Sequence, residues 1–168
     1  MFQLIKKQPP VRIIALGFAA VILLGSVLLM LPCSIQDGVT VRYIDALYTS
    51  TSAVCVTGLI AIDAGDTFTP LGQFFLGMLI QVGGLGVTAV GAGVILAMGK
   101  KVNMKGRNII REAMNLDSGK GTVRFIQSVF LTTITFELVG AALSFIVFAQ
   151  DYPPLHALGI SLFHSVAA

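Results

Sequence analysis

The stretch that decides the fold is Thr49-Ser50-Thr51-Ser52-Ala53-Val54-Cys55-Val56-Thr57-Gly58-Leu59. It is rich in hydroxyl groups, lies between two long apolar segments and is too short to cross a bilayer. This pattern predicts a re-entrant loop, in which a short helix enters the membrane and an extended segment returns. Irregular backbone at membrane depth is tolerated only where protein buries it or where it lines a water-filled path. The loop therefore indicates an ion pathway, with the backbone carbonyls of four residues as candidate ligands: Cys55, Val56, Thr57 and Gly58.

The composition is typical of a membrane protein. Of the 168 residues, 55% are hydrophobic and 11% are charged, whereas soluble domains carry about 25% charged residues. Three stretches, 13–36, 67–99 and 125–150, are apolar over the roughly 20 residues that a membrane span needs. We therefore expect an all-α membrane protein. The two cysteines, Cys33 and Cys55, have no metal-ligand spacing, and a packing role is the favoured interpretation for each.

The basic residues predict the orientation of the chain. All but one of the 11 Lys and Arg residues precede the first apolar stretch or lie between the second and the third. Because such residues gather on the cytoplasmic side, segments 1–12 and 100–124 are expected to be cytoplasmic. The 49–59 loop then enters from outside. This clustering argues against nucleic acid as the reason for the net charge of +3, although the basic face could also meet anionic lipid or an acidic partner.

The segment before the loop predicts a short pore helix over residues 43–54. Such a helix reaches about 18 Å, only part of the way across the bilayer. Its C-terminal end would point to the membrane centre, where the partial negative charge of the helix dipole favours a cation. Pro70 suits the first turn of the next helix. Gly58 permits backbone angles that other residues resist, and the alternative is a glycine that only turns the chain.

Two features of the apolar stretches are unusual. The second stretch is rich in glycine, which allows helices to approach closely, and Gly83-Gly84 with Gly86 could bend it. The third contains Glu137, the one acid inside a predicted span. An intramembrane carboxyl group is a functional hypothesis by default, but a structural hydrogen bond to a neighbouring helix is the favoured alternative.

The chain also repeats itself at an offset of 115 residues. In that register Ala46-Leu47-Tyr48-Thr49-Ser50 faces Ser161-Leu162-Phe163-His164-Ser165, and the first apolar stretch faces the third. Pro153-Pro154 then occupies the entry to a second short helix. We expect residues 13–99 to form one complete helix–re-entrant pore loop–helix repeat. Residues 125–168 are expected to form part of a second repeat, namely its first helix and the start of its pore helix.

These residues resemble the Trk/Ktr/HKT superfamily of potassium transporters, and within it the Ktr membrane subunit. The 49–59 loop and Gln81-Val82-Gly83-Gly84-Leu85-Gly86 carry the resemblance. It implies four repeats around a central pore, with Gly58 as the filter glycine of the first repeat and Cys55, Val56 and Thr57 lending carbonyls. It also implies a homodimer in the cell membrane on a cytoplasmic ring of nucleotide-binding regulatory subunits. No cofactor is implied beyond the transported K⁺, and Na⁺ is left open as a coupled ion.

The sequence therefore predicts potassium transport by the pore-forming subunit of a Trk/Ktr-type uptake system. No bond is made or broken in transport, so no enzyme activity is expected. Because the chain holds one repeat and part of a second, it is expected to be a portion of that subunit. Two alternatives stay open. One is a non-transporting membrane fragment that assembles with full-length subunits, and the other is a homo-oligomeric cation channel to which each copy donates one loop.

Overall fold

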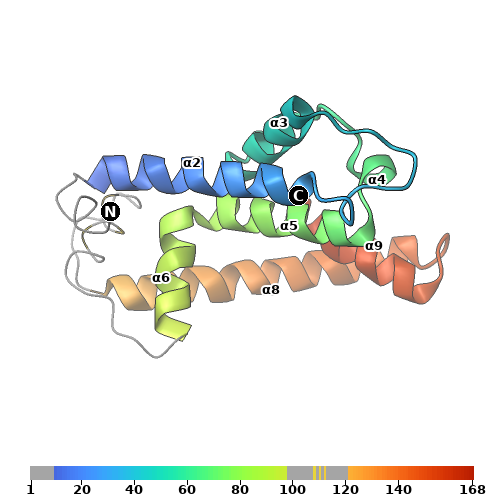
Figure 1. Cartoon of the computed structure of the whole chain (residues 1–168). Helices are drawn as coiled ribbons and strands as arrows, with labels where there is room; N and C mark the ends of the chain where they lie inside the picture. Colours follow the sequence, from blue (N-terminus) through green and yellow to red (C-terminus); the bar gives the residue numbers. More distant parts are fainter. Residues whose placement is uncertain (1–9, 98–107, 109, 111, 113–120) are drawn as a thin grey trace.

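The computed structural model describes residues 10–97, 108, 110, 112 and 121–168. This part of the chain is helical and has no strand, only an isolated bridge between Ile35 and Phe68. Its helices, drawn in Figure 1, are α2 (Pro10–Leu29), α3 (Tyr43–Val54), α4 (Ala64–Thr67), α5 (Pro70–Leu85), α6 (Val87–Ala97), α8 (Thr122–Phe148) and α9 (Pro154–Ala167). The predicted all-α class is confirmed for these residues. The predicted cytoplasmic segments 1–12 and 100–124 lie mostly outside them.

Among the described residues, two helices are long and apolar enough to cross a membrane, as judged by length and composition. They are Val11–Leu29 within α2 and Val123–Phe148 within α8, and only 11% and 6% of their most apolar windows are buried inside the chain. Figure 1 shows α2, α5 and α8 with their long axes along one direction. A helix that is apolar all round needs lipid or other protein around it, and the faces of α2 and α8 are open to either.

The predicted second span is not one continuous helix. Gly86 has a φ of +82° and separates α5 from α6, which Figure 1 shows running across the direction of α5. Only glycine adopts positive φ freely, and the bend that the sequence analysis allowed among Gly83, Gly84 and Gly86 occurs at the last of them. Pro70 occupies the first turn of α5, as predicted.

The first span helix is shorter than the apolar stretch that contains it. It ends at Leu29, and the chain turns before Pro32, which disfavours helical backbone at the residue before it. The Ser34 hydroxyl then donates to the Leu28 carbonyl at 2.8 Å and satisfies one of the carbonyls left free at the helix end. The apolar residues 30–36 therefore belong to a loop.

That loop is fastened to the start of α5. The Thr69 hydroxyl donates to the Cys33 carbonyl at 2.7 Å, and the Thr69 N–H donates to the Ser34 carbonyl at 3.0 Å. Gly72 lies so close to the Ser34 carbonyl that a side chain there would collide with it. The helices α2, α3 and α5 share a hydrophobic core, to which Phe68, the residue after α4, also contributes. Its buried members are Leu29, Ala46, Ala53, Val54, Phe68, Leu76 and Leu79. The core fixes the short helix α3 against two longer ones.

The same kind of hydrogen bond joins the two helices within each of the pairs α2–α3 and α8–α9. The Ser50 hydroxyl donates to the Ile22 carbonyl at 2.8 Å, and the Ser165 hydroxyl donates to the Glu137 carbonyl at 2.6 Å. The donors and the acceptors are both related by the 115-residue offset that the sequence predicts. Glycines related by the same offset face the two hydroxyls: a Cβ at Gly25 would lie 2.5 Å from Ser50 Oγ, and one at Gly140 would lie 2.6 Å from Ser165 Oγ.

Candidate functional site

The helix α3 has the bounds predicted for the pore helix, Tyr43–Val54. At its start, Arg42 Nε and Nη2 donate to the two Asp45 carboxylate oxygens at 2.9 and 3.0 Å. Asp45 lies in the first turn, where a negative charge complements the helix dipole. The hydrogen bond from Arg42 holds the pKa of Asp45 below its ordinary value, and the same contact raises the pKa of Arg42.

The serine and threonine hydroxyls of α3 all donate hydrogen bonds. Thr49 donates to the Asp45 carbonyl at 2.8 Å and Thr51 to the Leu47 carbonyl at 2.7 Å, so both bond within their own helix. Ser50, which is fully buried, bonds across to α2. In the described part of the chain no buried side-chain polar atom lacks a partner. A hydroxyl-rich helix is therefore packed among apolar ones without unpaired groups, whose burial would be costly.

The backbone leaves the helical conformation directly after α3. Val56 has a φ of +53°, and Gly58 has a φ of +69°. A β-branched residue at positive φ is an outlier, and such strain costs about 1–3 kcal/mol and persists only where the surroundings enforce it. A Cβ at Gly58 would meet nothing within 4 Å. The need for glycine at this position is therefore conformational, as the sequence predicts, and not a matter of space.

Hydrogen bonds to Ser52 tie the returning segment to α3. The Thr57 N–H donates to the Ser52 carbonyl at 3.0 Å, and the Thr57 hydroxyl donates to Ser52 Oγ at 3.0 Å. Ser52 Oγ in turn donates to the Leu59 carbonyl at 2.7 Å. The sequence analysis did not single out Ser52. The sequence shows only that a serine lies five residues before Thr57. Which groups the Ser52 hydroxyl bonds depends on how the chain turns at Val56.

The returning segment lines a groove of about 570 Å³. Three of the four predicted ligand residues, Val56, Thr57 and Gly58, lie on its wall, while Cys55 is exposed but outside that wall. The groove is also lined by Leu76 and Ile80 of α5, by Phe163 and Ala167 of α9, and by Ala168. The C-terminal end of α3 and residues of α9 therefore line one groove, and the dipole of α3 favours a cation there.

The close approach of α5 to the end of α3 depends on Gly83. A Cβ at this position would lie 2.5 Å from the Val54 carbonyl oxygen, whereas one at the neighbouring Gly84 would meet nothing within 4 Å. The sequence analysis expected glycines of this stretch to permit close packing but could not say which of them does so. Gly83 is the one that faces the residues immediately before the predicted ligands.

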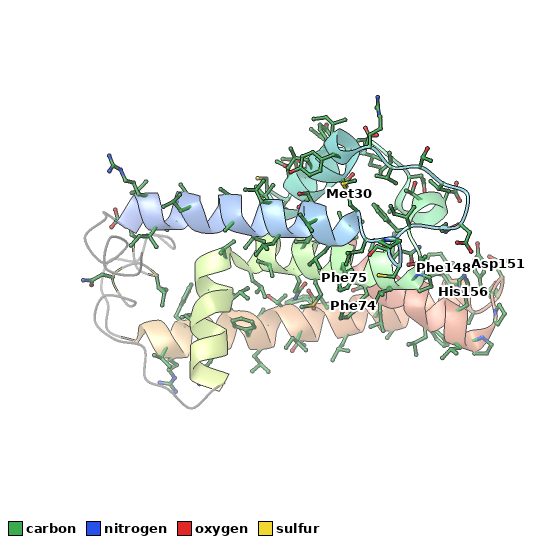
Figure 2. All side chains as sticks on the ribbon, viewed as in Figure 1. Met30, Phe74, Phe75, Phe148, Asp151 and His156 are labelled. Carbon is green, nitrogen blue, oxygen red and sulfur yellow. The ribbon has the colours of Figure 1, made fainter. Side chains whose placement is uncertain are left out.

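Other polar residues lie away from the groove. Glu137 is half-buried on α8, and its carboxyl group has no hydrogen-bond or ionic partner among the described residues. Its backbone carbonyl accepts the Ser165 hydroxyl. The ring of His156 packs on Tyr152 with centroids 5.4 Å apart, and Figure 2 shows His156, in the first turn of α9, near Asp151 of the turn before it. The structure does not bring these groups to the predicted ligands.

Comparison with known proteins supplies the family context. No protein-family model matches the chain. The chain is 38% identical over 159 residues to the Ktr system potassium uptake protein B of Bacillus subtilis. This match covers 95% of this chain and 35% of that protein. This chain is similar to Ktr-type potassium uptake proteins. It is also 33% identical over 163 residues to the potassium/sodium uptake protein NtpJ of Enterococcus hirae, covering 97% of this chain and 36% of that protein.

A third relative agrees with these two. The Ktr system potassium uptake protein D of Bacillus subtilis is 31% identical over 169 residues and covers 99% of this chain and 37% of that protein. The resemblance predicted from the 49–59 loop and the glycine-rich segment after it is confirmed. The chain spans about a third of the length of the relatives it matches. All three relatives are named as uptake proteins, for potassium or for potassium and sodium.

Proposed function

We propose that this chain forms part of the ion pathway of a Ktr-type potassium uptake protein. The backbone carbonyls of Cys55, Val56, Thr57 and Gly58 act as one strand of the selectivity filter, where they replace part of the hydration shell of K⁺. The observation that carries the proposal is the groove at the C-terminal end of α3, which this exposed, hydrogen-bonded backbone lines together with residues of α5 and α9. Transport makes and breaks no bond, so the activity is not enzymatic.

The proposed architecture is a set of helix–pore-loop–helix repeats. Residues 13–99 form the first and residues 125–168 part of the second. The hydrogen bonds Ser50–Ile22 and Ser165–Glu137 support this division, because they join a short helix to a long one in the same way at the same offset. One filter strand supplies about a quarter of the coordination of an ion, so transport needs further strands to replace the lost hydration.

The setting follows the predicted topology. Segments 1–12 and 100–124 face the cytoplasm, the 49–59 loop opens to the outside, and the protein lies in the cell membrane in contact with lipid. The whole subunit forms a homodimer on a cytoplasmic ring of nucleotide-binding regulatory subunits. The distribution of Lys and Arg supports the orientation. The names of the relatives, which refer to a Ktr system for potassium uptake, support the partner subunits.

A chimaera tests the proposed function. Residues 1–168 replace the matched segment of the Bacillus subtilis Ktr system potassium uptake protein B, and the chimaera is expressed in cells that lack their own K⁺ uptake. We expect the chimaera to restore growth at low K⁺ and the 168-residue chain alone to fail. Because one relative is a potassium/sodium uptake protein, Na⁺ uptake is measured alongside. A chimaera that reaches the membrane as abundantly as the parent protein but takes up no K⁺ contradicts the proposal.

A further inference from the structure

Ser52 has a different role from the other hydroxyl residues of α3. Thr49 and Thr51 bond to carbonyls of their own helix, and Ser50 bonds to α2. Ser52 Oγ reaches out of the helix to the Leu59 carbonyl, seven residues later in the chain, at 2.7 Å. Among the Ser and Thr residues of α3, Ser52 alone connects the pore helix to the segment that follows the predicted ligands.

Three hydrogen bonds meet at Ser52 and enclose the predicted ligands. Its carbonyl accepts the Thr57 N–H and its Oγ accepts the Thr57 hydroxyl, both at 3.0 Å, while the same Oγ donates to Leu59. The Thr57 hydroxyl is thereby engaged with α3.

Packing does not hold this segment within the chain. Residues 55–60 are all exposed, and Gly58 has open space around the position of a Cβ. Nevertheless Val56 keeps a positive φ that a β-branched residue avoids. Strained backbone persists only where the surroundings over-determine it. Val56 donates its own N–H to the Ala53 carbonyl at 3.3 Å, and the hydrogen bonds of Ser52 to Thr57 and Leu59 tie the chain after Val56 back to α3.

We propose that Ser52 is a positioning residue that holds the backbone of residues 56–59 in the conformation from which its carbonyls face a cation. The proposal rests on the proposed function for the identity of the ion, but its structural part does not. Loss of the Ser52 hydroxyl removes both the hydrogen bond to the Leu59 carbonyl oxygen and the hydrogen bond from the Thr57 side chain. The segment then relaxes around Val56, and the carbonyl orientation that distinguishes K⁺ from Na⁺ is lost.

The first test is amide hydrogen exchange on the 168-residue chain in lipid nanodiscs, which needs no transport. Ser52→Ala should accelerate exchange of the Thr57 amide about tenfold, the effect of weakening roughly one hydrogen bond. Ser52→Thr, which keeps the hydroxyl, should restore the slow exchange. Thr51→Val is the matched control, because its hydroxyl bonds only within α3 and its loss should leave Thr57 unchanged. Equal exchange in wild type and Ser52→Ala, or unprotected exchange in wild type, overturns the proposal.

The second test is the K⁺/Na⁺ uptake ratio of the chimaera that carries the same variants. Ser52→Ala should lower the ratio severalfold at similar membrane abundance, Ser52→Thr should recover it, and Thr51→Val should match wild type. An unchanged ratio in Ser52→Ala overturns the role in ion discrimination. A wild-type chimaera without K⁺ uptake contradicts the proposed function instead, and hydrogen exchange then decides whether Ser52 holds the segment.

Discussion

Gly83 lies against the carbonyl oxygen of Val54, so closely that a Cβ on the glycine would be 2.5 Å from that oxygen and 2.7 Å from the Ala53 oxygen. These two carbonyls end the pore helix, and the predicted ion ligands begin with the next residue. Backbone oxygens cannot rotate away as a side chain can. The position of the filter segment relative to α5 therefore depends on the absence of a side chain at residue 83.

The first prediction concerns this contact. Gly83→Ala should destabilise the protein by about 1–3 kcal/mol, the usual cost of overpacking a filled site, and should reduce K⁺ uptake by the chimaera. Gly84→Ala is the matched control, because it adds the same methyl group to the same helix in open space. Thermal unfolding in detergent and K⁺ uptake are measured for both variants. Equal behaviour of the two variants would show that α5 does not pack on the pore helix through Gly83.

The second prediction concerns the second helix pair. Gly140→Ala should be destabilising because its Cβ would lie 2.6 Å from Ser165 Oγ, and Ser165→Ala should relieve most of the clash. The residues are in contact, so a double-mutant cycle should give a coupling energy of about 0.5–3 kcal/mol. In the first pair, Ser50→Ala should rescue Gly25→Ala less well, because Leu79 methyl carbons would still lie within 2.7 Å of the new Cβ. Additive effects of Gly140→Ala and Ser165→Ala would count against the α8–α9 contact.

The third prediction concerns topology. In a background with Cys33→Ser and Cys55→Ser, Asp66→Cys should react with a membrane-impermeant thiol reagent added to intact cells, because Asp66 is exposed on the predicted outer side. Asn103→Cys should be protected until the cells are opened, since it belongs to the basic segment 100–124. Labelling of Asn103→Cys from outside would reverse the proposed orientation.

The fourth prediction concerns pH at the entrance of the pore helix. Arg42 lowers the pKa of Asp45, so this pair stabilises the folded state at pH values above the ordinary pKa of an aspartate. That contribution is lost as the pH falls through the lowered pKa. Asp45→Asn should therefore cause a small loss of thermal stability at pH 7 that shrinks at acid pH and at high salt, because the pair is exposed and screened. An effect of Asp45→Asn that grows on acidification would have the wrong sign.

The sequence predicted those parts of the structure that follow from local patterns. The bounds of α3 and the position of Pro70 are confirmed because a hydroxyl-rich helix and a proline each leave a local signal. The hydrogen bonds Ser50–Ile22 and Ser165–Glu137 follow the 115-residue offset. Other features were predicted only in part. The three glycines indicated a bend but not its place at Gly86, and the apolar character of residues 13–36 concealed the end of α2 at Leu29, shortly before Pro32.

The details of the candidate site also escaped sequence reasoning. Glycine at residue 58 signals positive φ, but valine at residue 56 signals the opposite, and its conformation is imposed by its surroundings. Ser52 looks like its hydroxyl neighbours along α3. Its partners Thr57 and Leu59 become evident only when the chain has turned around Val56.

The most direct test of the central claim is the K⁺/Na⁺ uptake ratio of the chimaera with Gly58→Ser. A serine at a φ of +69° is strained by about 1–2 kcal/mol, and the relaxed backbone should turn the carbonyls away from the ion. Gly91→Ser on α6 is the control, since it also has open space but no positive φ. The account predicts a markedly lower ratio for Gly58→Ser and a wild-type ratio for Gly91→Ser at equal membrane abundance. An unchanged ratio in Gly58→Ser would contradict the assignment of residues 55–58 to the filter.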